Sequence, residues 1–230
     1  MHWPQPLISA QFIRRENRFL AKVLLTESGN QVFAHVPSPG RMRELLISRA
    51  PVLLAAATNP HRKTAYDLYA VKTSQDILVI IDSRVANKLV KEAFQNQQLF
   101  SITELTSEKQ FGNSRLDFFA SKPSGKDVWI EVKSVTLNEQ GIALFPDAPT
   151  SRGSRHLEEL ISAVQQGYEA IVMFIIMRND CRRFSPNEAT DPRFASTLRR
   201  AAEQGVSIRA YSLSILEKEF LLGNEVAVAL

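Results

Sequence analysis

The chain has 230 residues, of which 44% are hydrophobic and 23% charged, an ordinary composition for a globular protein of one large domain or two small ones. It has no apolar run of about 18 residues and no basic segment followed by an apolar core near its start, so we expect neither a membrane partner nor a secretory signal. Cys181 is the only cysteine, which excludes an internal disulfide and a thiolate zinc cluster and predicts a reduced, cytoplasmic compartment.

The formal net charge of +4 is concentrated in the first third of the chain. Residues 1–83 hold ten Lys and Arg against six Asp and Glu, whereas the remaining 18 basic and 18 acidic residues cancel. A localised basic surface is typical of a protein that binds a phosphate backbone. The charge alone leaves a second interpretation open, a solvated face without a partner.

The first 83 residues alternate between short strand-like runs and turns. The pattern predicts one short helix over 41–47 and strands over 10–15, 19–25, 31–36, 52–57, 65–71 and 77–81. Several short strands with one small helix and a basic balance favour a small β-barrel of the oligonucleotide-binding (OB) type.

The pattern changes to mixed helix and strand after residue 83. Apolar residues at helical spacing predict a helix over 84–97, and Asp191-Pro192 and Gly205 are typical of the start and end of another. The remaining elements predicted are strands over 115–120, 128–133, 170–177 and 206–211, and helices over about 154–166 and 214–222. We therefore predict an OB-type barrel domain at 1–83 and a mixed α/β domain at 84–230.

Two acids and a lysine carry the clearest chemical signal. Glu131 and Lys133 lie two apart on a strand and share a face, and Asp117 lies near them if the 115–120 and 128–133 strands pair as a hairpin. Two neighbouring carboxylates repel each other unless a cation or proton intervenes, and Mg²⁺ accepts one or two carboxylates together with waters and phosphate oxygens.

The predicted cofactor is therefore Mg²⁺ or Mn²⁺, bound by Asp117 and Glu131. Lys133 is predicted to orient a water or to stabilise negative charge in a transition state. Glu92, at the border of the apolar stripe of the 84–97 helix, is predicted as a third acidic ligand. The alternative interpretation of so short a motif is an ordinary surface ion pair.

Longer motifs resemble the sugar fermentation stimulation protein A family in the same order along the chain. They are HVPSPGRMRELL (35–46), RKTAYDLYAV (62–71), ANKLVKEAF (86–94), EVKSVTL (131–137) and FPDAPTSRGSRHLEEL (145–160). The resemblance implies an N-terminal OB-type barrel, a C-terminal domain of the PD-(D/E)xK nuclease type, DNA as the partner and a role in regulating sugar catabolism.

Carried over residue by residue, the nuclease-type pattern falls on Asp117, Glu131 and Lys133, with Glu92 as the acid from the preceding helix. The chain departs from the pattern at Leu116, where a proline often precedes the first acid. It also has Ser38 in the Pro-Ser-Pro-Gly turn, where we expect asparagine to be common.

Basic residues in two regions are candidates for DNA contacts. The segment 147–156, which leads into the predicted helix, carries Arg152 and Arg155 beside His156, and a helix N-terminus suits phosphate. The barrel domain contributes Arg41, Arg43, Arg62 and Lys63. Solvated arginines without a ligand are the alternative for both regions, and His35, on a predicted strand, is expected to be a hydrogen-bonded structural histidine.

Three functional hypotheses follow. The first is a DNA-binding regulator that keeps a nuclease-type metal site, and its alternative is an active Mg²⁺-dependent DNA endonuclease; both predict the same residues, and fold resemblance does not prove activity. The third is an interaction domain without a nucleic-acid partner. The sequence determines neither the preferred DNA structure nor the oligomeric state.

Overall fold

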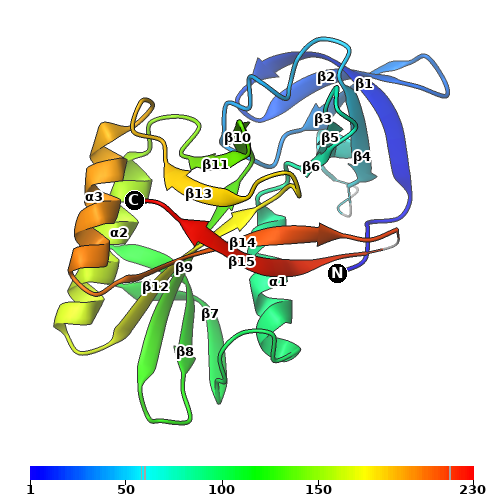
Figure 1. Cartoon of the computed structure of the whole chain (residues 1–230). Coiled ribbons are helices and arrows are strands. Elements are labelled where there is room, and N and C mark those ends of the chain that lie inside the picture. The colour runs from blue at the N-terminus through cyan, green and yellow to red at the C-terminus, as the bar shows by residue number, and fades with distance from the viewer. Residues whose placement is uncertain (58, 60, 218) are drawn as a thin grey trace.

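Residues 7–80 form the predicted barrel. In the computed structural model, which describes residues 1–57, 59, 61–217 and 219–230, the barrel strands are β1 (Leu7–Asn17), β2 (Leu20–Leu25), β3 (Gln31–His35), β4 (Pro51–Ala56), β5 (Tyr66–Lys72) and β6 (Leu78–Ile80). The first five close as β1-β2-β3-β5-β4-β1, since β3 pairs with both β2 and β5. Alternate side chains of these strands fill the interior, so the OB-type prediction is confirmed. Figure 1 shows the barrel strands in blue to cyan.

The helix predicted over 41–47 is wrong. Residues 43–46 form a turn instead, and Met42 before them has a positive φ of 48°, which a right-handed helix does not accommodate. Met42 and Leu45 are buried in the barrel interior. Their apolar spacing, which imitates a helix face, comes from a folded loop that closes one end of the barrel.

The second domain is built on a mixed nine-stranded sheet with the order β10-β11-β13-β15-β14-β12-β9-β8-β7. Its strands are β7 (Glu104–Phe111), β8 (Ser114–Ser121), β9 (Asp127–Val135), β10 (Leu137–Glu139), β11 (Ile142–Phe145), β12 (Glu169–Ile176), β13 (Arg183–Pro186), β14 (Ser207–Ile215) and β15 (Phe220–Val228). β7, β8 and β9 run antiparallel, and β12 is parallel to β9.

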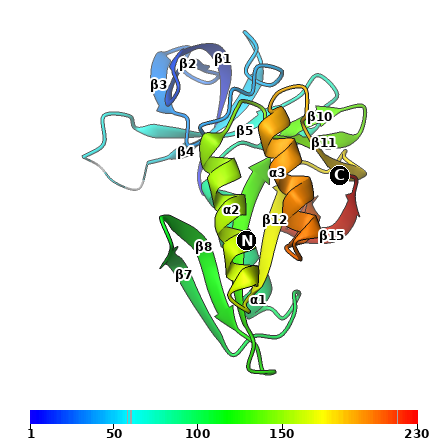
Figure 2. The same cartoon turned by 90° about the vertical axis from the view of Figure 1, so that its left-hand side faces the viewer.

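Helices cover both faces of this sheet. α1 (Arg84–Gln95) packs its apolar stripe on one face, against side chains that include Val128, Ile130 and Val132 of β9. α2 (Ser151–Gln165) and α3 (Pro192–Glu203) lie side by side on the other face, as Figure 2 shows. With α1, β7 to β9, α2 and β12 at its centre, the domain has the mixed α/β fold class that the sequence predicted. Within the described residues, no helix is long and apolar enough to cross a membrane.

The end of the chain differs from the prediction. The helix predicted over 214–222 is wrong: β14 continues to Ile215 and then pairs antiparallel with β15. Phe220 and Leu222 alternate into the core with a period of two, although a short apolar run cannot be assigned to helix or strand by spacing alone. Lys218, within that predicted helix, lies outside the described residues. The sequence pattern does not predict the strands β7, β10, β11, β13 and β15, which the structure adds.

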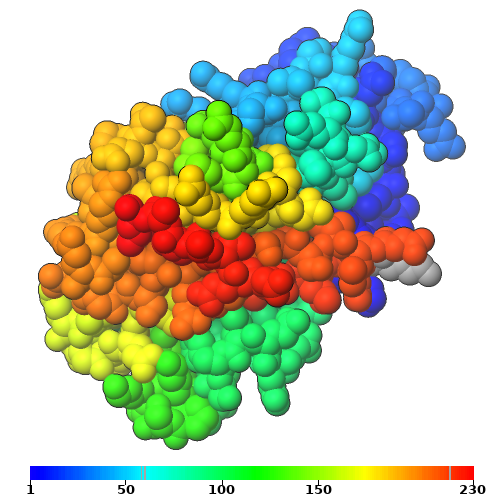
Figure 3. Space-filling view, in the orientation of Figure 1, coloured from blue at the N-terminus to red at the C-terminus, as the bar shows by residue number. Residues whose placement is uncertain are grey.

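One apolar cluster spans both domains, in addition to the separate core of the barrel interior. Trp3 and Tyr69 of the N-terminal part pack against Phe220 of β15, with ring centroids 4.9 Å and 6.5 Å from it. The backbone N–H of Ile80 donates to the carbonyl of Met177 at 3.0 Å. The first three residues therefore contact the second domain, and the space-filling view shows the orange and red β14–β15 hairpin running across the molecule below the blue barrel (Figure 3).

Candidate metal centre

The predicted hairpin brings Asp117 and Glu131 together. The regular antiparallel pairing of β8 with β9 ends at Phe118, which lies opposite Ile130. Asp117, the residue before Phe118, lies just beyond this paired stretch. Asp117, Glu131 and Lys133 line an open cleft of about 530 Å³, which we call the sheet cleft. Because β9 is paired on both sides, with β8 and β12, the two β9 residues sit on one of the most constrained strands of the fold.

Glu131 is a buried carboxylate with one engaged oxygen and one unpartnered oxygen. Its residue exposure is only 2%, and its Oε1 accepts from Lys133 Nζ and from His156 Nδ1, both at 2.5 Å. Its Oε2 is buried and has no hydrogen-bond partner. Burial alone raises the pKa of Glu131, but Lys133 and His156 outweigh burial and hold that pKa at about 2, so the group is an anion at neutral pH.

His156 belongs to the same cluster from the opposite side. It lies on α2 and is 2% exposed, and its Nε2 accepts a hydrogen bond from Arg152 Nε at 3.2 Å. An arginine nitrogen only donates, so Nε2 of the ring is the acceptor and Nδ1 carries the proton that is donated to Glu131. His156, itself held by Arg152, thus fixes the orientation of the Glu131 carboxylate from the α2 side.

Asp117 has the opposite electrostatic character. Its Oδ1 accepts from Asn87 Nδ2 of α1 at 2.7 Å, and its Oδ2 accepts from the backbone N–H of Val132 at 2.8 Å. Burial and the nearby charge of Glu131 raise the pKa of Asp117 to about 6, although Lys133 and the two hydrogen bonds act against that rise. Two carboxylates whose pKa values are pushed apart are typical of functional sites.

Glu92 does not join this cluster, which corrects its prediction as a third acid. Its carboxylate pairs with the N-terminal amine of Met1, which also donates to the carbonyl of Phe220. Arg84 and Asn87 are the α1 residues that line the sheet cleft. Glu92 follows Asn87 by five positions, which rotates it roughly 140° around the helix.

The donor set suits a hard divalent cation held by few protein ligands. In the described part of the chain, no three His, Cys, Asp or Glu side chains form a group that could hold a metal ion by themselves. Mg²⁺ often uses only one or two carboxylates and keeps waters and substrate oxygens as its other ligands. A buried carboxylate oxygen without a partner, beside a second carboxylate in an open cleft, fits such an ion.

Arginines extend the site towards the barrel. A second cleft, the barrel cleft, adjoins the sheet cleft, and both contain Arg18, Pro39, Gly40, Ala148 and Pro149. Arg41 and Arg43 are exposed and line the barrel cleft. Arg15 instead supports the loop from within, because its guanidinium donates to the carbonyls of Arg18, Ser38, Gly40 and Arg41.

The loop before Arg41 is docked on the second domain. The backbone N–H of Met42 donates to Asp147 Oδ2 at 3.0 Å. A Cβ at Gly40 would lie 2.6 Å from that same oxygen, so a side chain at this position would require the Asp147 carboxylate to shift. Asp147 also lines the sheet cleft, so this docking forms part of its wall.

The other predicted DNA-binding residues are dispersed. Arg62 donates to Asp67 Oδ1 at 2.6 Å, and His35 and Arg84 bind the same carboxylate. Burial alone raises the pKa of Asp67, but these three groups outweigh burial and hold that pKa at about 2. The expected structural hydrogen bond of His35 is therefore present. Lys63 is exposed in the turn after β4, and Arg155 is exposed on α2 outside both clefts, whereas Arg152 lines the sheet cleft.

Sequence reasoning missed several residues that complete the site. Asn87 and Arg84 of α1, together with Arg18 and Asp147, line the sheet cleft. The i, i+3 spacing of Arg84 and Asn87 at the polar start of the helix is a signal that both lie on one side of it. No local pattern indicates that His156 meets Glu131, because 25 residues and two different elements separate them.

An OB-type barrel fixed to a mixed α/β domain, with an acid–lysine cleft beside their junction, defines the class of this protein. Residues 13–81 match the family model described as the SfsA N-terminal OB domain, and residues 84–219 match the sugar fermentation stimulation protein RE domain. The chain therefore belongs to the sugar fermentation stimulation protein (SfsA) family, as the motifs predicted.

Relatives match along the whole chain. The sugar fermentation stimulation protein homolog of Clostridium perfringens (strain 13 / Type A) is 42% identical over 233 aligned positions, with 100% of both chains covered. The Clostridium kluyveri homolog is 41% identical, with 97% of each covered. A solved structure, Pyrococcus furiosus SfsA in complex with Ca²⁺, is 30% identical and matches with a TM-score of 0.91, covering 100% of this chain and 98% of that one.

Proposed function

We propose that this protein binds DNA and hydrolyses its phosphodiester bonds with a divalent cation, Mg²⁺ or Mn²⁺, held by Asp117 and Glu131. The observation that carries the proposal is the buried, unpartnered Oε2 of Glu131 in a cleft that also holds Asp117 and Lys133. The solved structure of Pyrococcus furiosus SfsA in complex with Ca²⁺ supports a hard-cation site, because Ca²⁺ and Mg²⁺ both take carboxylate oxygens.

Each side chain has a defined task in this proposal. A bound divalent cation polarises the phosphodiester and lowers the pKa of an attacking water. Asp117 and Glu131 hold the cation, and His156 fixes the rotamer of Glu131. The ammonium of Lys133, only 12% exposed, stabilises negative charge that develops on the phosphate in the transition state. Arg18, Arg84 and Arg152 line the cleft and hold the flanking phosphates.

Incubation of the protein with single-stranded, duplex and branched DNA in Mg²⁺ or Mn²⁺ tests this proposal. We expect cleavage of at least one DNA form by the wild-type protein and none by Glu131→Gln, which keeps the shape of the side chain but not its charge. A parallel incubation with Ca²⁺, which also takes carboxylate oxygens, compares binding of a metal with cleavage of the DNA. Binding of the metal and of DNA without any cleavage would leave the second candidate function.

That second candidate is a DNA-binding regulator that keeps the metal site without appreciable turnover. It is favoured by one observation: Glu92 pairs with the N-terminal amine of Met1, so α1 adds no carboxylate to Asp117 and Glu131. The name of the relatives, sugar fermentation stimulation protein, supports a role in sugar catabolism. No side chain of either cleft bears on that role, which stays a prediction from the resemblance.

DNA binding itself is expected to depend on Arg41 and Arg43. Changing both to alanine should weaken the binding of all DNA sequences about equally and lower the salt dependence of log Kd by about two, because each arginine is assigned one phosphate contact. Fluorescence anisotropy over a range of salt concentrations measures both quantities.

A matched control is Arg199→Ala with Arg200→Ala, two arginines on α3 that pair with Glu188 and Glu158 outside both clefts. This double variant should bind DNA as the wild type does. If the Arg41 and Arg43 variant keeps full affinity and an unchanged salt slope, the barrel cleft is not a DNA contact. A loss for one sequence only would instead indicate contacts to base edges.

A further inference from the structure

The outer face of β2 and β3 carries side chains that the barrel interior does not use. Ala21, Val23 and Ala34 point inward and are fully buried. The alternate residues therefore face outward, and the pairing places Lys22 opposite Phe33 and Leu20 opposite His35. This outward row lies on the strands that OB folds commonly offer to nucleic acid.

Two phenylalanine rings are exposed on this face. Phe19, just before β2, is 49% exposed, and Phe33 is 47% exposed. Of the large apolar side chains that the structure describes, they are the aromatic ones with exposure this high. Each exposed ring costs hydration free energy without adding to the core, so a ligand that covers these rings is favoured.

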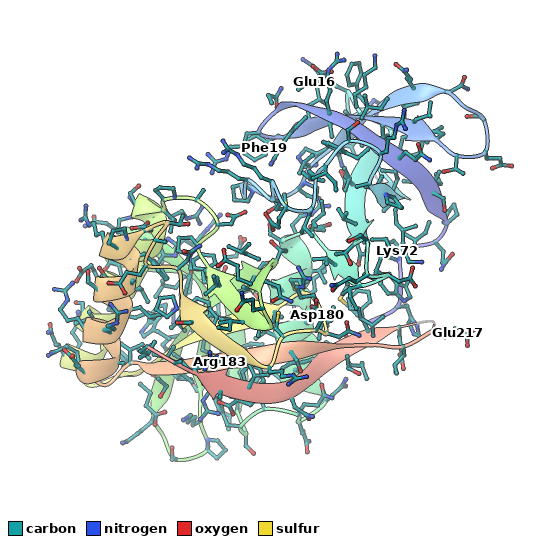
Figure 4. The ribbon with its side chains drawn as sticks, turned by 45° about the horizontal axis from the view of Figure 1, so that its top comes forward. Glu16, Phe19, Lys72, Asp180, Arg183 and Glu217 are labelled. Atoms are coloured by element: carbon teal, nitrogen blue, oxygen red, sulfur yellow. The ribbon has the colours of Figure 1, made fainter. Side chains whose placement is uncertain are left out.

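Cationic and planar groups accompany the rings. The guanidinium of Arg18 lies over Phe19, 5.5 Å from its centroid, and the ring of His35 stacks on Phe19 at 6.5 Å with an interplanar angle of 25°. Figure 4 labels Phe19 on the outside of the barrel, on its side towards the second domain. We call this set, Phe19, Lys22, Phe33 and His35, the barrel platform.

The barrel platform is continuous with the sheet cleft. Arg18, which covers Phe19, lines both the barrel cleft and the sheet cleft. From the other end, His35 binds Asp67, and Asp67 binds Arg84, which also lines the sheet cleft. A chain of phosphates that leaves the platform therefore meets arginines on its way to Asp117 and Glu131.

We propose that the barrel platform binds the unpaired bases of single-stranded DNA, and that the substrate carries such a single-stranded stretch beside the cleaved bond. This inference rests on the proposed DNA-binding function. Exposed aromatic rings stack on the faces of bases, and only unpaired bases offer those faces, because base pairs in a duplex cover one another. Lys22 and Arg18 supply the positive charge for the accompanying backbone.

Binding of a fluorescent oligothymidylate of about 12 nucleotides, within the site size of one OB fold, tests the proposal. The full-length protein is titrated in EDTA, so that cleavage plays no part, and a duplex of random sequence is measured in parallel. We expect Phe19→Ala and Phe33→Ala each to weaken binding of the single strand about tenfold or more, with little change for the duplex. Phe19→Tyr and Phe33→Tyr should restore the affinity.

Leu216→Ala is the matched control, since Leu216 is 46% exposed but lies on the β14–β15 hairpin. It should leave both affinities unchanged, and thermal melts check that the phenylalanine variants remain folded at the temperature of the titration. Unchanged affinity of the alanine variants for the single strand overturns the platform while leaving the proposed function intact. Absence of binding to single strand and duplex alike overturns the proposed function as well.

Discussion

Replacing Asp117 with asparagine is expected to stabilise the metal-free protein at about pH 8 and to abolish its response to Mg²⁺ or Mn²⁺. The pKa of Asp117 is raised from 3.8 to about 6, so the folded protein holds this proton more tightly than the unfolded chain does. The associated stability is fully present below about pH 4 and is lost as the pH rises through 6. The ionised group then costs on the order of 3 kcal/mol, since one pKa unit corresponds to about 1.4 kcal/mol.

Thermal melts with and without millimolar metal measure both effects. In a chain of this size about 1 kcal/mol shifts the melting temperature by roughly 2–4 °C, so the metal-free variant should melt several degrees higher at about pH 8. At about pH 4 the two proteins should melt together, because Asp117 is then protonated. In the wild type, metal should raise the melting temperature by mass action, since the ion binds only the folded state.

Asp127→Asn is the control for this experiment. Asp127 lies on the same hairpin and accepts from Ser121 Oγ, but it does not line the sheet cleft. Its variant should respond to metal as the wild type does. Melting curves indifferent to metal in the wild type and in Asp117→Asn alike would mean that Asp117, Glu131 and Lys133 form an ordinary ion-pair cluster.

Replacing Lys133 with methionine is expected to reduce single-turnover cleavage by about 10²- to 10³-fold while keeping metal binding. The methionine retains the apolar stem but removes the charge assigned to the transition state, and removal of one such group typically costs that much. It also leaves the buried Glu131 with less compensation, which destabilises the metal-free protein. A bound cation restores that compensation, so the metal-induced rise in melting temperature should be larger than in the wild type.

Lys126→Met provides the comparison, because Lys126 is exposed in the turn between β8 and β9. It should cleave DNA at the wild-type rate. Undiminished cleavage by Lys133→Met would mean that Lys133 does not stabilise the transition state. Simultaneous loss of cleavage and of the metal response would move its role to assembly of the metal site.

The parts of the site that lie on neighbouring strands were predictable from the sequence. Strand alternation places Glu131 and Lys133 on one face, and the short hairpin connection places Asp117 beside them. The position of Glu92 depends on how α1 is rotated over the sheet. Both Asn87 and Glu92 border its apolar stripe, and only packing decides that Asn87 meets Asp117 while Glu92 meets the N-terminus.

Other features depend on contacts between distant segments. His156 reaches Glu131 because α2 covers the face of β9 on which Glu131 lies. The segment 214–222 is ambiguous because Leu216 and Phe220 have the i, i+4 spacing of a helix, whereas Phe220 and Leu222 have the i, i+2 spacing of a strand. Element type was therefore predictable where a pattern is long, as in α1 and β12, and ambiguous where a segment is defined by its partners.

The docking of the Gly40 loop on Asp147 forms part of the wall of the sheet cleft and also holds the barrel at a fixed distance from the site. The barrel cannot turn over the sheet without breaking the bond from Met42 to Asp147 and the bond from Ile80 to Met177, or without separating Trp3 from Phe220. A DNA strand held on the barrel would consequently reach Asp117 and Glu131 after a constant number of nucleotides. If the proposed cleavage takes place, this fixed junction would set the distance from the barrel to the cleaved bond, independently of the DNA sequence.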